Sequence, residues 1–288
     1  MNSDVQSQSD KPYAPPLDKL LRYGDPREMK DGVKYLAAGI GSEHVPELIR
    51  MATDENLNNA LSDSPQVWAP LHAWRTLGKL RAESAIEPLL TLFRRIDEQD
   101  DDWVLEDLPQ AIGEIGVPAL PALSACLADN SRKLGACEAA AISVKEIGRL
   151  HPESRSQCVA ILSDQLGKSR EKGSSLNGAI VSLLLDLEAI EVAPCMEQAF
   201  AAGLVDESVA GDWEDVQIEL GLKEERATSS KFTAFPPLRR MAESGCQSPV
   251  FNNASFPDLR AMNKAQKKAR SEAKKAKWKR MLQRQRRK

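Results

Sequence analysis

One apolar pattern recurs along this chain at a fixed spacing. Gly78, Gly113 and Gly148 lie 35 residues apart, each stands near the end of one apolar run, and each is followed by a second run. This period is typical of paired helices that stack, where each pair buries its apolar face only against its neighbours. The spacing therefore predicts an all-α fold, a right-handed α-solenoid of helical hairpins.

The three glycines suggest a mechanical role at helix ends. Glycine adopts the left-handed backbone conformation without a Cβ penalty and often follows the last turn of a helix. We therefore expect each glycine to end the first helix of its hairpin. The fourth junction departs from the pattern, because Leu185-Asp186-Leu187-Glu188 stands where a glycine is expected.

Composition supports helices and a reduced protein. Apolar residues make up 42% of the chain and aromatic residues only 5%, which favours packing through Ala and Leu over a β-sandwich. The polar start predicts no secretory signal, and no apolar run reaches the roughly 18 residues needed to cross a bilayer. An odd number of widely spaced cysteines predicts free thiols and a cytoplasmic location. They are Cys126, Cys137, Cys158, Cys195 and Cys246.

The net charge is divided between two parts of the chain. Residues 260–288 hold 14 Lys and Arg against the single acid Glu272, a net charge of +13. The whole chain carries −3, so residues 1–259 carry −16. Any functional hypothesis must explain an acidic body followed by a basic tail.

Breaks in composition predict four segments. Residues 1–14 are polar and are expected to be disordered, and residues 15–221 form the predicted solenoid. Residues 222–258 are rich in Pro, Ser and Asn and are predicted to be a linker. Residues 259–288 are the basic tail, for which a disordered or weakly helical state is expected because like charges repel.

Four motifs carry a resemblance to a known group. They are PPLDKLLRYGDPRE at 15–28, EHVPELIRMATD at 43–54, VWAPLHAWRTLGKLRAESAIEPLL at 67–90 and GDWEDV at 211–216. Together they resemble an uncharacterised bacterial family of HEAT-like repeat proteins, a domain of unknown function. The resemblance implies HEAT-like hairpins, as in bilin lyases, but no chemistry. Some members of that family end in a cysteine-rich zinc motif of the SEC-C kind, and only Cys246 is available here.

A groove is predicted where aromatic and charged residues share one helix face. Trp68, His72 and Arg75 follow helical spacing, and Trp103, Glu106 and Asp107 occupy similar places one repeat later. Such a groove would accept a peptide or a planar ligand. The alternative is that the tryptophans fill gaps between repeats and His72 makes a structural hydrogen bond.

The tail predicts binding to a polyanion. Clustered Lys and Arg attract phosphate backbones through counterion release, and a tryptophan among them can stack on an exposed base. RNA or the ribosome is the first expectation. An anionic membrane surface, or the acidic body of the protein itself, is the alternative. The candidate residues are Lys267, Lys268, Arg270, Lys274, Lys275, Lys277, Trp278, Lys279, Arg280, Arg284, Arg286 and Arg287.

A second acidic motif precedes the linker. In Gly211-Asp212-Trp213-Glu214-Asp215, Asp212 is expected to cap a final helix and Trp213 to close the end of the core. The alternative is an acidic contact for a basic partner, including the tail.

No motif for a reaction is present. His44, His72 and His151 are far apart, and no His or Cys pair stands at metal-ligand spacing. The expectation is therefore no metal, no cofactor and no catalytic residues.

The sequence favours a non-enzymatic scaffold or adaptor whose solenoid binds an unidentified protein and whose tail contacts RNA, the ribosome or another polyanion. One alternative is a small-ligand or chromophore chaperone resembling the HEAT-like bilin lyases. Another is a structural protein that self-assembles through its acidic body and basic tail. The sequence does not fix the oligomeric state.

Overall fold

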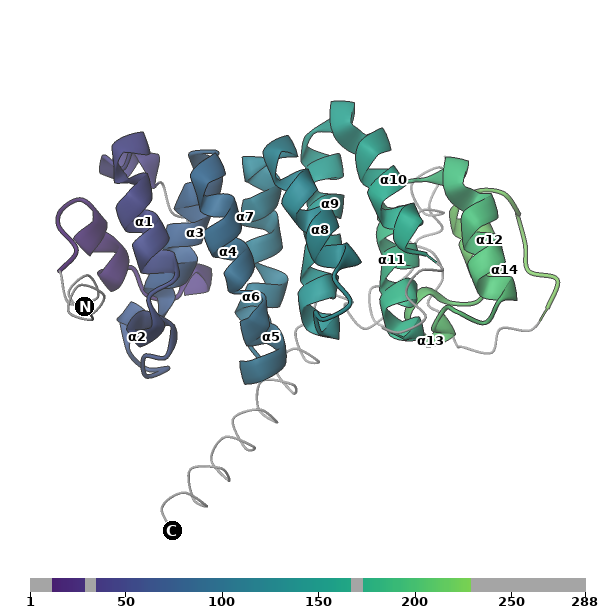
Figure 1. Cartoon of the computed structure of the whole chain (residues 1–288), viewed down its shortest axis with the longest axis horizontal. Coiled ribbons are helices and arrows are strands. Elements are labelled where there is room, and N and C mark those ends of the chain that lie inside the picture. The colour runs from purple at the N-terminus through teal and green to yellow at the C-terminus, as the bar shows by residue number, and fades with distance from the viewer. Residues whose placement is uncertain (1–11, 29–34, 167–172, 229–288) are drawn as a thin grey trace, which may run out of the picture. The chain divides into compact units, whose positions relative to one another are not determined.

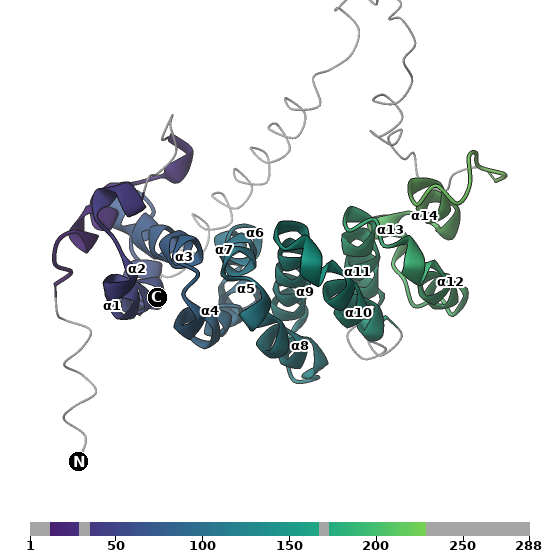
Figure 2. The ribbon, with the colours of Figure 1, turned by 90° about the horizontal axis from the view of Figure 1, so that it is seen from above.

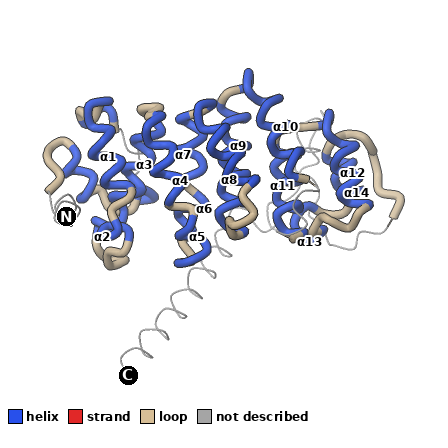
Figure 3. The backbone as a smooth tube through the Cα atoms, viewed as in Figure 1, coloured by secondary structure: helices blue, strands red, loops and turns tan. Residues whose placement is uncertain are grey.

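A computed structural model describes residues 12–28, 35–166 and 173–228 of the chain. All regular secondary structure in these ranges is helical (Figure 3). They belong to one compact unit, Met1–Phe235, and a second unit covers Pro236–Lys288. The basic tail and all but the first seven residues of the predicted linker lie outside the described residues.

The α-helices follow one another in chain order (Figure 1). They are α1 Val45–Ala52, α2 Glu55–Asn58, α3 Ala69–Lys79, α4 Ile86–Thr91, α5 Arg94–Gln99, α6 Asp102–Glu106, α7 Leu108–Ile115, α8 Leu120–Ala128, α9 Leu134–Leu150, α10 Arg155–Gln165, α11 Ser174–Asp186, α12 Ala193–Ala201, α13 Glu207–Ala210 and α14 Trp213–Glu219. Short 3₁₀ helices precede them or connect them, and Leu17–Arg22 is the longest of these in the described ranges.

The longer helices form two layers (Figure 2). In the layer that we call layer A, α3 packs on α7, α7 on α9, and α9 on α11. In layer B, α1, α4, α8, α10 and α12 lie behind them, with α1 on α3, α8 on α9, and α10 on both α9 and α11. Each hairpin therefore contributes one helix to each layer.

The buried core repeats with the sequence period. Leu77, Ile112 and Ile147 are 35 residues apart and fully buried, one on each of α3, α7 and α9. Each of these residues immediately precedes one of the three repeat glycines. The periodic apolar pattern thus identifies the contact between consecutive layer A helices.

The repeat glycines do not end their helices, so the expectation of a left-handed role is wrong. Gly78, Gly113 and Gly148 lie inside α3, α7 and α9. A Cβ on Gly78 would lie 2.8 Å from the backbone oxygen of Ala111 on the next helix. A Cβ on Gly113 would lie 2.7 Å from the Cβ of Glu146. Glycine is needed at these two positions because neighbouring helices approach closely.

Three positions after Gly148, His151 has φ −126°, but the first two repeats and the fourth hairpin have residues with positive φ near this place. They are Arg81 (φ 51°), Gly116 (φ 93°) and Glu188 (φ 52°). After Arg81, the N–H of Ala82 donates to the oxygen of Leu77 at 3.1 Å, which closes the helix end. Two of these left-handed residues are therefore not glycine, and the sequence carries no direct sign of them.

Polar contacts also join α5 to the start of α9. Asp97 lies within α5. Its carboxylate accepts hydrogen bonds from the N–H of Gly135 at 2.9 Å and from the N–H of Ala136 at 3.1 Å. These are two of the unpaired N–H groups in the first turn of α9. A carboxylate on α5, 38 positions earlier in the chain, thus caps the longest helix of the described residues.

A buried arginine fixes the same region. The side chain of Arg95 is only 4% exposed and pairs with Asp101 at 3.0 Å and with Glu55 at 3.4 Å. It also donates to the backbone oxygen of Asn58 at 3.0 Å. Because several partners compensate its charge, burial of this guanidinium is tolerated.

The ordered body extends past both predicted boundaries. Tyr13 precedes the predicted start at residue 15, yet its hydroxyl donates to Asp54 at 2.9 Å. The guanidinium of Arg50 lies 3.8 Å from the centre of the Tyr13 ring.

After residue 221, Arg226 forms ion pairs with Asp212 and Asp215 at the start of α14. Residues 222–228 thus pack on the helical body rather than belonging to the predicted linker.

No single helix in the described ranges has both the length and the apolar composition to span a membrane. Two consecutive segments, Asp102–Ile115 and Val117–Ala128, meet these criteria only when taken together, and they meet at an angle of 114°.

The close approach at Gly78 can be tested with alanine. Alanine inside a helix is normally favoured over glycine by about 0.5–1 kcal/mol. At Gly78 the new Cβ would overlap a backbone oxygen, so we expect Gly78→Ala to lower the free energy of unfolding by about 1–3 kcal/mol. At Gly148 the nearest atom, the Cβ of Cys158, is 3.1 Å away, so Gly148→Ala should cost less. Urea unfolding followed by circular dichroism measures both, and equal stability of the two variants would contradict this account.

Candidate functional site

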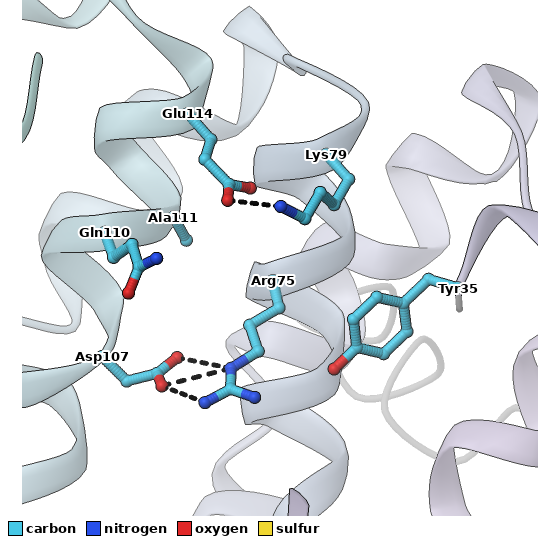
Figure 4. A pocket seen from close by; sticks show the side chains of 7 residues that line it. All are labelled: Tyr35, Arg75, Lys79, Asp107, Gln110, Ala111 and Glu114. Carbon is cyan, nitrogen blue, oxygen red and sulfur yellow. Dashed lines mark hydrogen bonds and ion pairs between the residues drawn. The ribbon is translucent and has the colours of Figure 1, made fainter. Parts of the chain in front are cut away.

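A polar hollow opens between α3 and α7 (Figure 4). Its volume is about 280 Å³. Positive, negative and neutral polar side chains alternate around it. The lining residues are Tyr35, Arg75, Lys79, Asp107, Gln110, Ala111 and Glu114.

The lower edge of the hollow is an ion pair held in a fixed orientation. The Nε of Arg75 donates to both carboxylate oxygens of Asp107, at 2.9 and 3.1 Å, and its Nη2 donates to the same group. The indole N–H of Trp74 donates to Asp107 at 2.9 Å. Three donors therefore hold this carboxylate in place, and the hydrogen bonds to it raise the pKa of Arg75.

A second ion pair bridges the same helices further along the hollow. The Nζ of Lys79 lies 2.6 Å from the Oε1 of Glu114. Because these residues are 35 positions apart, the repeat itself brings them together. Further along layer A, Lys145 lies 2.5 Å from Glu146 and 3.8 Å from Asp186, which joins α9 to α11. Ion pairs thus recur between consecutive helices of this layer.

His72 does not line the hollow, and its prediction as a groove residue is wrong. The side chain is fully buried. Its Nε2 lies 2.8 Å from the backbone oxygen of Gly24, and its Nδ1 lies 2.9 Å from the hydroxyl of Tyr35. A carbonyl oxygen only accepts, so Nε2 carries the proton and Nδ1 accepts from Tyr35. Residues 17–28 cover this face of α3 and leave His72 the structural role that was the alternative.

A chain of hydrogen bonds connects the hollow to these covering residues. Tyr35 lines the hollow together with Arg75, and the hydroxyl of Tyr35 donates to His72. Burial raises the pKa of Tyr35 to about 12, and burial lowers the pKa of His72. Both side chains therefore stay neutral near pH 7, which suits a buried network.

The two predicted tryptophans meet, but outside the lining of the hollow. The rings of Trp68 and Trp103 lie edge to face with centroids 4.9 Å apart and an interplanar angle of 77°. The guanidinium of Arg27 lies over both rings. Glu106 is exposed on α6 and is not among the residues that line the hollow. Of the six predicted groove residues, only Arg75 and Asp107 line it.

The sequence analysis missed four polar residues of the hollow. Lys79 stands four positions after Arg75, and Glu114 seven positions after Asp107, so helical spacing alone could have found them. Gln110 lies on α7, between Asp107 and Glu114 in the sequence. Tyr35 comes from the connection before α1, and no spacing rule would have placed it there.

The final acidic motif is occupied by the chain itself. Asp212 accepts from the N–H of Asp215 at 3.0 Å, and the carboxylate of Asp215 accepts from the N–H of Asp212 at 3.2 Å, a capping box at the start of α14. The ring of Trp213 packs on Phe200 with centroids 5.7 Å apart. Arg226 and Lys223 pair with the acids of the motif. These contacts agree with the capping interpretation.

The described residues offer little for covalent or metal chemistry. Within them, no three His, Cys, Asp or Glu side chains are grouped to hold a metal ion. Cys126, Cys137 and Cys158 are buried. Burial raises the pKa of Cys158 and of Cys195, which disfavours the thiolate that a nucleophile requires.

Comparison of the chain with protein-family models, curated proteins and solved structures gives no match. The resemblance to HEAT-like repeats therefore rests on the sequence motifs alone. The predicted polyanion-binding residues, Lys267 to Arg287, lie outside the described part of the chain.

The buried imidazole makes stability depend on pH. Because the pKa of His72 is lowered in the folded state, the unfolded chain takes up a proton first as pH falls through the ordinary value of 6.5. The stabilisation is thus complete above this pH and is lost progressively below it. Carboxyl groups with lowered pKa values, such as Asp25, contribute only at lower pH, below about 5.

We expect His72→Gln to remove most of the pH dependence between about pH 7.5 and about pH 5.5. Glutamine keeps a donor for the oxygen of Gly24 but does not titrate. Urea unfolding at several pH values gives the slope for each protein. An unchanged slope in the variant would show that another group is responsible.

Proposed function

We propose that this chain is a cytoplasmic, non-enzymatic adaptor built as a right-handed α-solenoid of HEAT-like hairpins. The chain-order packing of α3, α7, α9 and α11 and the regular burial of Leu77, Ile112 and Ile147 support this architecture. Stacked hairpins of this kind present extended surfaces rather than enclosed reaction sites. An odd number of widely spaced cysteines supports a reducing compartment.

In this proposal, the exposed face of layer A binds a protein partner. The hollow between α3 and α7 is open and displays the Arg75–Asp107 and Lys79–Glu114 pairs at fixed positions. Donors and acceptors arranged in this way suit the backbone and polar side chains of a protein segment. In the two pairs the cationic side chains are more exposed, at 35% and 55%, than the carboxylates, at 13% and 19%, so the cations are the groups that a partner can reach.

The same geometry disfavours the chromophore-chaperone alternative. That hypothesis required Trp68, His72, Arg75 and Trp103 to form one pocket. His72 is fully buried, and the tryptophan pair does not line the hollow that contains Arg75. A volume of about 280 Å³ is also at the small end for a site that encloses a large planar ligand.

The division of charge carries the second half of the proposal. A net charge of +13 in residues 260–288, beside −16 in residues 1–259, is suited to holding a polyanion away from an acidic body. We propose that the tail contacts RNA or the ribosome, with Trp278 stacking on an exposed base.

Truncation after Leu259 tests the role of the tail. We expect the full chain to bind RNA with an affinity that falls about 1,000-fold or more between about 50 and 200 mM salt. The truncated chain should lose this binding and keep the same unfolding temperature. Electrophoretic mobility shift and thermal denaturation measure the two properties. Salt-sensitive RNA binding by the truncated chain would refute the assignment to the tail.

Site-specific cross-linking tests the face of layer A. A photoreactive amino acid at Gln110 lies in the hollow, and the same group at Ala125, exposed on α8 in layer B, is the matched control. We expect one partner to be captured from position 110 at low and high salt and not from position 125. Equal capture from both positions would contradict a binding face on layer A. Capture of a second copy of this chain would support self-assembly instead.

A further inference from the structure

Two tryptophans from adjacent hairpins form an aromatic corner. Trp68 ends the 3₁₀ helix Pro65–Trp68 before α3, and Trp103 lies in the first turn of α6. Their planes are nearly perpendicular, at 77°, with centroids 4.9 Å apart. Both rings remain partly exposed. Two ring walls at this angle can present π-faces to one cation.

The corner already holds a cation of the chain itself. The guanidinium carbon of Arg27 lies 4.7 Å from the ring centre of Trp103 and 5.4 Å from that of Trp68. The carboxylate of Asp25 accepts from the Nε of the same guanidinium at 2.9 and 3.0 Å, and also from its Nη2. We call these four residues the tryptophan corner. It combines two aromatic faces with a bidentate carboxylate.

The exposure of Arg27 distinguishes this contact from a structural one. Arg95, which is structural, is 4% exposed, whereas the side chain of Arg27 is 65% exposed. The carboxylate of Asp25 is much less exposed, at 15%, and hydrogen bonding to Arg27 lowers its pKa. The anionic and aromatic parts of the corner are thus set in the fold, while the cation lies at the surface.

We propose that Trp68, Trp103 and Asp25 form a binding site for an arginine side chain of a partner protein, with Arg27 as the internal occupant that this arginine replaces. The proposal rests on the protein-binding role inferred above and specifies the chemistry of the partner.

Arginine suits the corner better than lysine does. Its planar guanidinium can stack on a ring and form a two-pronged contact with a carboxylate at the same time, as Arg27 does. A lysine ammonium has no such planar fork. The net charge of −16 on residues 1–259 would also attract a basic segment of a partner to this part of the chain.

An internal occupant lowers the apparent affinity for an external one. A ligand that can enter only when Arg27 has left binds with an affinity reduced by the fraction of time that the corner is open. Removal of the Arg27 side chain should therefore strengthen binding. This direction is the opposite of that expected if Arg27 itself contacted the partner.

The test is titration of the full-length protein with a short neutral-ended peptide that contains one arginine, followed by calorimetry and by the indole N–H signals in NMR spectra. We expect Arg27→Ala to bind this peptide at least about tenfold tighter than the wild type. The lysine version of the peptide should bind more weakly. Arg22→Ala, which removes a nearby exposed arginine that pairs with Asp18, is the matched control and should behave as wild type.

Two further variants keep the test decisive. Trp103→Leu and Asp25→Asn, each combined with Arg27→Ala, should abolish the gain in affinity, and either one suffices if the other fails to fold. Equal affinity of wild type and Arg27→Ala, or a gain that survives both second substitutions, would overturn the proposal. Binding that appears only after residues 260–288 are removed would identify the chain's own tail as the occupant and would also overturn it.

The outcomes separate this site from the adaptor role. Capture of a partner from position 110 without an effect of Arg27→Ala on arginine affinity would keep the adaptor and reject the corner. Tight arginine binding by Arg27→Ala without any captured partner would keep the corner as a guanidinium site and reject the adaptor.

Discussion

The close approach of consecutive layer A helices is the constraint on which the rest of the structure depends. At Gly78, the backbone of α3 comes so near to Ala111 of α7 that no Cβ fits between them. This approach aligns side chains that are one repeat apart, and the Lys79–Glu114 pair is the immediate result. Beside this pair, Arg75 meets Asp107, which lies 32 positions later, and the two side chains form one edge of the hollow. Backbone contact therefore sets both the core and the polar surface.

Three arginines show how local surroundings give one side chain different roles. Arg95 is buried among several partners and supports the fold. Arg75 is half-buried and forms one edge of the hollow through Asp107. Arg27 lies at the surface, over two aromatic rings. The three side chains differ in exposure, at 4%, 35% and 65% for Arg95, Arg75 and Arg27, and this burial, not the residue type, separates their surroundings.

The sequence predicted the helical fold, and the 35-residue period of its glycines matches the spacing of the buried residues Leu77, Ile112 and Ile147. It failed where a contact depends on a distant segment. His72 shares a helical face with Trp68 and Arg75, but residues 17–28 and Tyr35 bury it, and no spacing rule reveals that cover. The glycines were located correctly but explained wrongly, since a period gives positions and not the atoms they meet. Arg27 needed the folded chain to bring it over Trp103.

The cap that Asp97 provides for α9 makes this helix depend on an earlier part of the chain. The first turn of α9 takes two of its hydrogen-bond acceptors from a carboxylate on α5, which precedes α7 and α8 in the chain. A chain cut between α5 and α9 would leave exposed amide groups at the start of a 17-residue helix. Duplication or exchange of single hairpins at this junction would break the same contacts. The start of α9 thus depends on the chain before it, because a hairpin that begins with α9 and stands alone lacks both hydrogen bonds.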